Sequence, residues 1–119
     1  LELFIGSEKI GEGGPLLFTD RQVLLGAGAN GQVYLANAPQ QFPIETIVVP
    51  GVDGKSYTLE AAIPWQALAI QPKEGQELLF DLAINDSPSG TNRERQLMWN
   101  GTAKNSGDRT HWGGAKLIR

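Results

Sequence analysis

Residues 57–68 read "YTLEAAIPWQAL", and this stretch indicates the fold. It alternates with the two-residue period of a β-strand, with Tyr57, Leu59, Ala61 and Ile63 on one side and Thr58, Glu60 and Ala62 on the other. Pro64 has no N–H to donate to a sheet and suits the first position of a helical turn. We therefore expect a strand that ends in one short helical turn near residues 64–68, with Trp65 and Leu68 closing one end of a β-sandwich.

Outside this stretch, alternating apolar residues predict further short strands. They lie at residues 1–5, 17–25, 32–36, 44–49, 77–86, 94–99 and 115–118. Asn30-Gly31 and Asp53-Gly54 are turn signals between neighbouring strands. The chain also holds 15 glycines and 7 prolines, which suits short strands joined by turns. The sequence predicts an all-β fold, an antiparallel β-sandwich of jelly-roll type with about eight short strands.

Composition and charge exclude several classes of function. With 119 residues the chain fits one domain. A net charge of −3 argues against a nucleic-acid partner, and the lack of cysteine excludes disulfides and thiolate zinc sites. No apolar stretch approaches the about 20 residues needed to span a bilayer, so we expect no membrane insertion. The chain begins without methionine and without a signal peptide, so we expect it to be part of something larger.

Enzyme chemistry has little support in the sequence. There is one histidine, no cysteine, and no serine in a G-x-S-x-G setting. Glu60 with Asp81 or Glu94 is a conceivable glycosidase pair, but we expect no catalytic activity. Glu60 is expected to be solvated on its strand or, if a loop covers it, to pair with Arg93 or Arg95.

Five segments occur in an order that resembles the family 9 carbohydrate-binding modules. They are "ELFIG" at 2–6, the stretch 57–68, "GQELLFDLAINDS" at 75–87, "RERQLMWNG" at 93–101 and "HWGGAKLI" at 111–118. The resemblance implies a β-sandwich domain of the kind found in secreted polysaccharide-degrading and cell-surface proteins of bacteria. That family has additional strands and a clamp tryptophan before "ELFIG". The resemblance therefore implies that residues 1–119 form a single β-sandwich domain, the C-terminal two thirds of a larger module.

The resemblance also bears on the sugar site. Of the residues with which the family contacts sugar, the resemblance implies that this chain retains Glu2. Leu24 stands where the family has a basic residue, Ala83 where it has a glutamine, and Gly107 where it has the second clamp tryptophan. Aromatic faces stack on sugar rings, and carboxylates and amides bond to the hydroxyls. On this basis the candidate carbohydrate-binding residues are Glu2, Gln22, Asn85, Asn105, Trp99 and Trp112. Core packing is the alternative for the two tryptophans, and an exposed strand carboxylate is the alternative for Glu2.

Two functions remain open. The first is a non-catalytic carbohydrate-binding module of a secreted or cell-surface bacterial protein, with a plant or microbial polysaccharide or oligosaccharide as partner. The second is a structural or protein-interaction module that has lost the sugar site. An exposed aromatic ring near Glu2 favours the first, and a flat apolar patch favours the second. Residues 1–6 are also expected to present an unpaired edge or an uncovered apolar face that recruits another copy or a companion chain.

No cofactor is firmly indicated. Asn85, Asp86 and Asn92 supply oxygen ligands that suit a structural calcium ion, and a plain turn is the alternative. Haem-binding relatives of the same sandwich draw attention to Met98 with His111 as axial ligands, but an apolar filler is the ordinary role of a strand methionine.

Overall fold

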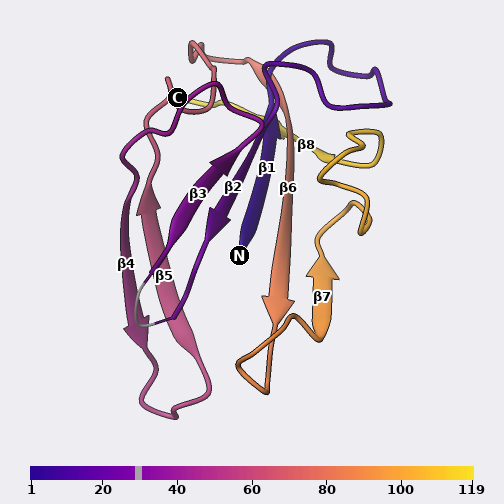
Figure 1. Ribbon diagram of the computed structural model, residues 1–119. Helices are drawn as coiled ribbons and strands as arrows, with labels where there is room; N and C mark the ends of the chain where they lie inside the picture. Colours follow the sequence, from indigo (N-terminus) through magenta and orange to yellow (C-terminus); the bar gives the residue numbers. More distant parts are fainter. Residues whose placement is uncertain (29–30) are drawn as a thin grey trace.

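The protein folds into two antiparallel β-layers in the computed structural model, which describes residues 1–28 and 31–119 (Figure 1). The strands are β1 (Glu2–Gly6), β2 (Arg21–Leu25), β3 (Val33–Ala36), β4 (Glu45–Pro50), β5 (Tyr57–Ala62), β6 (Glu77–Asp86), β7 (Arg95–Met98) and β8 (Gly113–Lys116). The all-β prediction is confirmed. The predicted Asp53-Gly54 turn connects β4 to β5, whereas Asn30 of the other predicted turn lies outside the described residues.

The larger sheet is organised around the long strand β6. Its strand order is β3-β2-β1-β6, and both β8 and β7 pair with the other edge of β6. There, β8 pairs with residues 77–80 and β7 with residues 83–86.

Strand β1 is central in this sheet. It pairs with β2 on one side and β6 on the other, with Leu3 opposite both Val23 and Leu82. The expectation of an unpaired edge at residues 1–6 is therefore wrong. The physical reason is that β1 carries buried side chains on both faces, Ile5 on one and Phe4 on the other, as a covered central strand does.

We call the two faces of this sheet inner and outer. The inner face carries Ile5, Val23, Leu35 and Leu78, and it packs against the second layer, the hairpin of β4 and β5. The outer face carries Glu2, Phe4, Gln22, Asp81 and Ala83, which alternate with the inner residues along their strands. Both faces contain buried apolar clusters, so the sheet is covered by different parts of the chain on its two sides.

The stretch after β5 forms the expected helical turn. Its backbone N–H groups at residues 67–69 donate to the carbonyls three positions earlier, at 2.9–3.2 Å. Ala67, Leu68 and Ile70 are buried against the inner-face core. Trp65 is 43% exposed, so the prediction that it plugs the sandwich is wrong. It starts the turn on the solvent side, and the later residues fill the core.

Arg21 fixes this turn to the larger sheet. Its Nε donates to the carbonyl of Ala67 at 3.2 Å, and its Nη1 donates to the carbonyls of Phe18, Asp20 and Asn37 at 2.6–2.9 Å. Burial lowers the pKa of the guanidinium, and the neighbouring Asp20 carboxylate raises it in part. An arginine stays charged in proteins, so the four carbonyls keep a cationic donor.

A buried ion pair holds the glycine-rich loop between β1 and β2. Arg109 Nε lies 2.9 Å from Asp20 Oδ2, and neither side chain is exposed to solvent. The Arg109 guanidinium also donates to the carbonyls of Glu8, Lys9 and Glu12 in that loop at 2.7–3.1 Å. A side chain at Gly6 would overlap the Asp20 carboxylate, which explains the glycine at the end of β1.

Residues 100–112 fold over the outer face. The buried carboxylate of Asp81 accepts hydrogen bonds from the backbone N–H groups of residues 100 and 101 (2.9 and 2.7 Å) and from Asn105 Nδ2 (2.6 Å). Trp112 packs on Phe4 with ring centroids 5.5 Å apart, and its Nε1 donates to the Asn105 carbonyl at 3.2 Å. This segment therefore encloses the smaller, outer-face core.

The second layer leaves part of the inner face uncovered. Figure 1 shows the β4–β5 hairpin on the side of β3 and β2, away from β7. Ile84 and its cross-strand partner Leu97 are 46% and 68% exposed, and Trp99, edge-on to Phe80, is 61% exposed. We call Ile84, Leu97 and Trp99 the open inner face.

Candidate functional site

A carboxylate–amide network lies on the outer face of the larger sheet. Glu2 Oε1 accepts a hydrogen bond from Asn85 Nδ2 at 2.9 Å, and Asn85 Oδ1 accepts one from Gln96 Nε2 at 2.9 Å. Gln22 Nε2 donates a long hydrogen bond to Glu2 Oε2, at 3.4 Å. The four side chains come from β1, β6, β7 and β2, so the sheet register brings them together.

Glu2 is unusual because it is 8% exposed although it carries a carboxylate. The ion pairs found among the described residues do not include it, and its hydrogen-bond donors are the side-chain amides of Asn85 and Gln22. A carboxylate offers about four lone-pair positions, and the network supplies two donors. Glu2 therefore keeps acceptor capacity for the O–H or N–H groups of a ligand.

A small hollow of about 90 Å³ opens at this network. Its lining includes Glu2, Gln22, Gln96, Arg93 and Met98. It has room for about three water molecules, so a hydroxyl or hydroxymethyl group fits inside and a larger ligand must lie across its mouth. Met98 packs against the outer-face core, the ordinary role of a flexible apolar residue.

The structure brings only some of the predicted sugar-binding residues together. Glu2, Gln22 and Asn85 share the network. Asn105 lines the same hollow but is 1% exposed, and its side chain is joined to Asp81 and to the Thr102 N–H.

Neither candidate tryptophan offers a ring face to the hollow beside Glu2. Trp112 is buried against Phe4, so neither face of its indole is free for stacking. Trp99 is exposed, but it belongs to the open inner face, on the opposite side of the sheet from Glu2.

The three candidate calcium ligands do not converge. Asn85 and Asp86 are successive residues of β6 and point to opposite faces. Asp86 Oδ2 pairs with Arg95 Nη2 at 3.2 Å, and Asn85 belongs to the Glu2 network. Asn92 lies in the loop after β6, where its backbone carbonyl accepts from Ser87 Oγ at 2.5 Å.

The carboxylates considered for glycosidase chemistry are also separated. Glu60 is exposed on β5, opposite Ile47, in agreement with a solvated strand carboxylate. Asp81 is buried under residues 100–112, and Glu94 accepts from the Ser89 N–H at 3.1 Å in a loop. These groups lie on different parts of the fold and do not flank a common cleft.

Two residues of this surface were not singled out from the sequence. Gln96 completes the network from β7, and Tyr34 on β3 exposes 57% of its surface on the outer face. Tyr34 is opposite Leu24, which is opposite Glu2, so the three form a row across adjacent strands. The alternation with Val33 and Leu35 could have indicated that Tyr34 points outward, but its neighbours depend on strand order.

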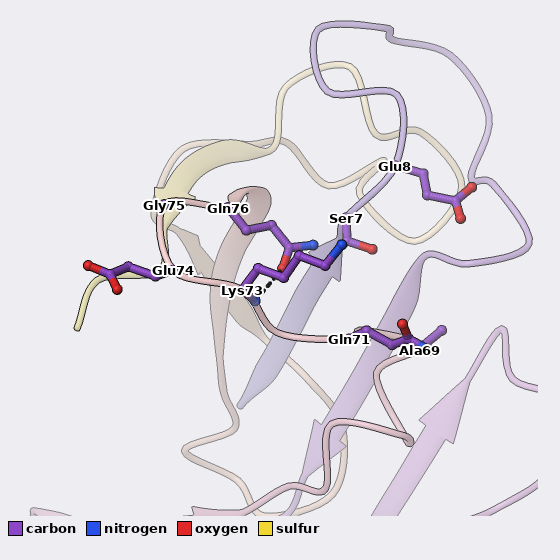
Figure 2. A pocket seen from close by; sticks show the side chains of 8 residues that line it. All are labelled: Ser7, Glu8, Ala69, Gln71, Lys73, Glu74, Gly75 and Gln76. Atoms are coloured by element: carbon purple, nitrogen blue, oxygen red, sulfur yellow. Dashed lines mark hydrogen bonds between the residues drawn. The ribbon is translucent and has the colours of Figure 1, made fainter.

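A larger hollow, of about 630 Å³, lies at the far end of β1 (Figure 2). It is lined by Ser7, Glu8, Ala69, Gln71, Lys73, Glu74, Gly75 and Gln76. Figure 2 shows one hydrogen bond among them, from the Lys73 N–H to Gln76 Oε1 at 3.1 Å. Its charged side chains are exposed and of both signs, and no aromatic ring lines it, so it offers no buried group comparable to Glu2.

The comparisons with known proteins identify the class of the domain. The model of the "Carbohydrate family 9 binding domain-like" family matches residues 31–119. The chain belongs to this family, which confirms the resemblance seen in the sequence. Family 9 carbohydrate-binding modules are non-catalytic, and the prediction that the chain is not an enzyme is confirmed.

A solved structure shows the same fold. It is a family 9 carbohydrate-binding module from Caldicellulosiruptor kristjanssonii in complex with cellotriose, with a TM-score of 0.78 and 19% sequence identity. The match covers 98% of this chain and 56% of that one, so the chain spans about half the length of this structural relative. A search of curated proteins finds no match. Within the described residues, no helix has the length and apolar character needed to cross a membrane.

Proposed function

We propose that this chain is a non-catalytic carbohydrate-binding module whose sugar site is centred on Glu2. The observation that supports it best is the nearly buried carboxylate, held by side-chain amides and open to a hollow on the outer face. Membership in the family supports the class of ligand. The structural relative was solved in complex with cellotriose, which makes an oligosaccharide the first ligand to test.

The proposed site binds by hydrogen bonding at its centre. The Glu2 carboxylate accepts from sugar hydroxyls, and such charge-assisted bonds are about twice as strong as neutral ones. Gln22 and Gln96 hold amide groups that donate and accept beside it. Arg93 at the rim adds an exposed donor.

We propose further that the parent protein is secreted or attached to a bacterial cell surface and binds plant or microbial polysaccharide. Polysaccharides of this kind lie outside the cell, so a module that attaches to them acts there. A screen of insoluble cellulose, xylan and mannan by retention, followed by calorimetry with soluble oligosaccharides, identifies the polymer.

Replacing Glu2 with glutamine tests the site. Glu2→Gln keeps the shape and the Asn85 hydrogen bond but removes the charge, so we expect at least about tenfold weaker binding, as the loss of a charged hydrogen bond implies. Glu45→Gln, an exposed glutamate of β4, is the matched control and should bind as wild type does. If the wild-type chain binds no glucan, xylan or mannan at millimolar concentration, the proposed function is wrong.

The open inner face supports a further proposal about domain organisation. We propose that residues 1–119 are the C-terminal part of a larger module, in which additional strands cover Ile84, Leu97 and Trp99. An apolar strand face left in water is unfavourable and is prone to pair with other chains. The same patch is the observation that favours the second candidate function, a protein-interaction module.

Self-association tests this proposal. The 119-residue chain should form dimers or larger species in sedimentation velocity, and Leu97→Lys should shift it toward monomer because a charge then lies in the apolar contact. Ile118→Lys, which alters an apolar residue that is 83% exposed near the C-terminus, should leave the distribution unchanged. A monodisperse wild-type monomer at millimolar concentration would contradict the proposal that additional strands cover the open inner face.

A further inference from the structure

A second hollow adjoins the Glu2 network on the outer face. Its volume is about 460 Å³, and its lining includes Leu24, Tyr34, Gln32 and Asn85. Asn85 donates to Glu2, which lines the first hollow, so this hydrogen bond joins one lining residue of each hollow. The first hollow is small and polar, and the second is wider and has an aromatic and an aliphatic side chain in its lining.

The sheet register fixes how these groups are arranged. Tyr34 is opposite Leu24 across β3 and β2, and Leu24 is opposite Glu2 across β2 and β1. Side chains at paired positions of an antiparallel sheet point to the same face, and neighbouring strands are about 4.8 Å apart. The Tyr34 ring and the Glu2 carboxylate therefore stand on one surface, about two strand spacings or 10 Å apart, with Leu24 between them.

The exposure of these residues suits a stacking surface. Tyr34 is 57% exposed, whereas its neighbour Leu35 is 1% exposed, so the ring lies on the sheet without being part of the core. A tyrosine ring offers an apolar face to C–H groups and keeps a hydroxyl for a polar partner. Leu24 is half-buried and extends the apolar surface toward Glu2.

We propose that Tyr34 and Leu24 form a platform for a second sugar ring when Glu2 binds the first. This inference rests on the proposed function and names the ligand more closely: a neutral oligosaccharide of at least two pyranose rings with C–H-rich faces. A single ring at Glu2 does not need the platform, because hydrogen bonds hold it. A carboxylated sugar is disfavoured beside Glu2 because like charges repel, and the exposed Arg93 at the rim offsets this repulsion only weakly.

The chain has two tyrosines and both are exposed, so a test of Tyr34 by substitution has a matched control. Tyr57, 46% exposed on β5 opposite Pro50, belongs to the other layer and is the matched control. The probes are glucose and cellotriose, titrated into the 119-residue chain by calorimetry. Thermal unfolding of each variant checks that the fold is intact.

We expect Tyr34→Ala to weaken cellotriose binding by about tenfold, as the loss of one aromatic stacking contact implies, and to leave glucose binding unchanged. Tyr34→Phe should retain most of the cellotriose affinity, and Tyr57→Ala all of it. Wild-type cellotriose affinity in Tyr34→Ala, together with lost affinity in Glu2→Gln, would overturn the platform and leave the Glu2 site standing. Absence of binding in the wild-type chain would overturn both.

Discussion

Replacement of Arg109 with methionine is expected to lower the free energy of unfolding by about 3–5 kcal/mol, the usual cost of breaking a buried ion pair from one side. The change leaves the Asp20 carboxylate without its cation in a position with no solvent exposure. It also removes the donor from the carbonyls of Glu8, Lys9 and Glu12. A loss of this size is a large part of the about 5–15 kcal/mol that stabilises a typical domain.

Urea unfolding followed by tryptophan fluorescence measures this effect. Arg95→Met is the matched control, because Arg95 also pairs with an aspartate, but at the surface with 70% and 50% exposed side chains. We expect the control to cost about 1 kcal/mol or less. The double variant Arg109→Met/Asp20→Asn should lose less free energy of unfolding than the two single variants lose together. The reason is that each single change leaves the other charge buried without a partner. Equal stabilities for Arg109→Met and Arg95→Met would contradict the structural role of the buried pair.

Replacement of Trp112 with alanine is expected to lower the free energy of unfolding by about 3–5 kcal/mol, as for other buried aromatic side chains. The indole is 5% exposed, stacks at a tilt on Phe4 and donates to the Asn105 carbonyl. Its removal leaves a cavity below the outer face and an unpaired carbonyl. Trp112→Phe, which retains most of the packing, should cost less.

The two roles considered for Trp112 give opposite results. If Trp112 is a packing residue, its replacement lowers stability, and the folded Trp112→Phe variant keeps the sugar affinity of the wild type. If Trp112 stacks on the sugar, its replacement lowers the sugar affinity and leaves stability unchanged. Trp65→Ala, at a partly exposed tryptophan, is the control for stability and should cost about 1 kcal/mol or less. Unchanged unfolding of Trp112→Ala would contradict the packing role.

The fold could be predicted well from the sequence where side chains alternate clearly. The bounds predicted for β5 and β6 nearly match the observed ones because apolar residues mark one side of each strand. The last strand was predicted at 115–118 but lies at Gly113–Lys116, because glycines give no periodic signal. A side chain at Gly113 would meet the Phe80 carbonyl and the Trp99 ring, so packing in the folded state selects glycine there.

The strand predicted at 17–25 shows a different limit. The structure begins β2 at Arg21, because residues 17–20 form a turn in which Asp20 Oδ2 accepts from the Leu17 N–H at 2.8 Å. The Asp20 carboxylate of this turn is paired with Arg109, 89 positions further along the chain. Local pattern contains no information on such a partner.

The candidate site could be predicted in part. Glu2, Gln22 and Asn85 were proposed from residue type and resemblance, and the structure places them in one network. The position of Trp99 on the other face follows from its place after β7, and the row that joins Tyr34 to Glu2 follows from the order of three strands. Both depend on pairing between distant segments, which residue composition and periodicity do not determine.

The central position of β1 has a consequence for synthesis of the protein. Ile5 pairs with Phe80, so one side of the first strand has no partner until β6 has left the ribosome. At about 5–20 residues per second, elongation over that interval takes several seconds. Topologies with such distant pairing also fold slowly after all residues are available, in milliseconds to seconds. The nascent chain therefore carries Leu3 and Ile5 without their final neighbours for a period in which chaperone binding can compete with folding.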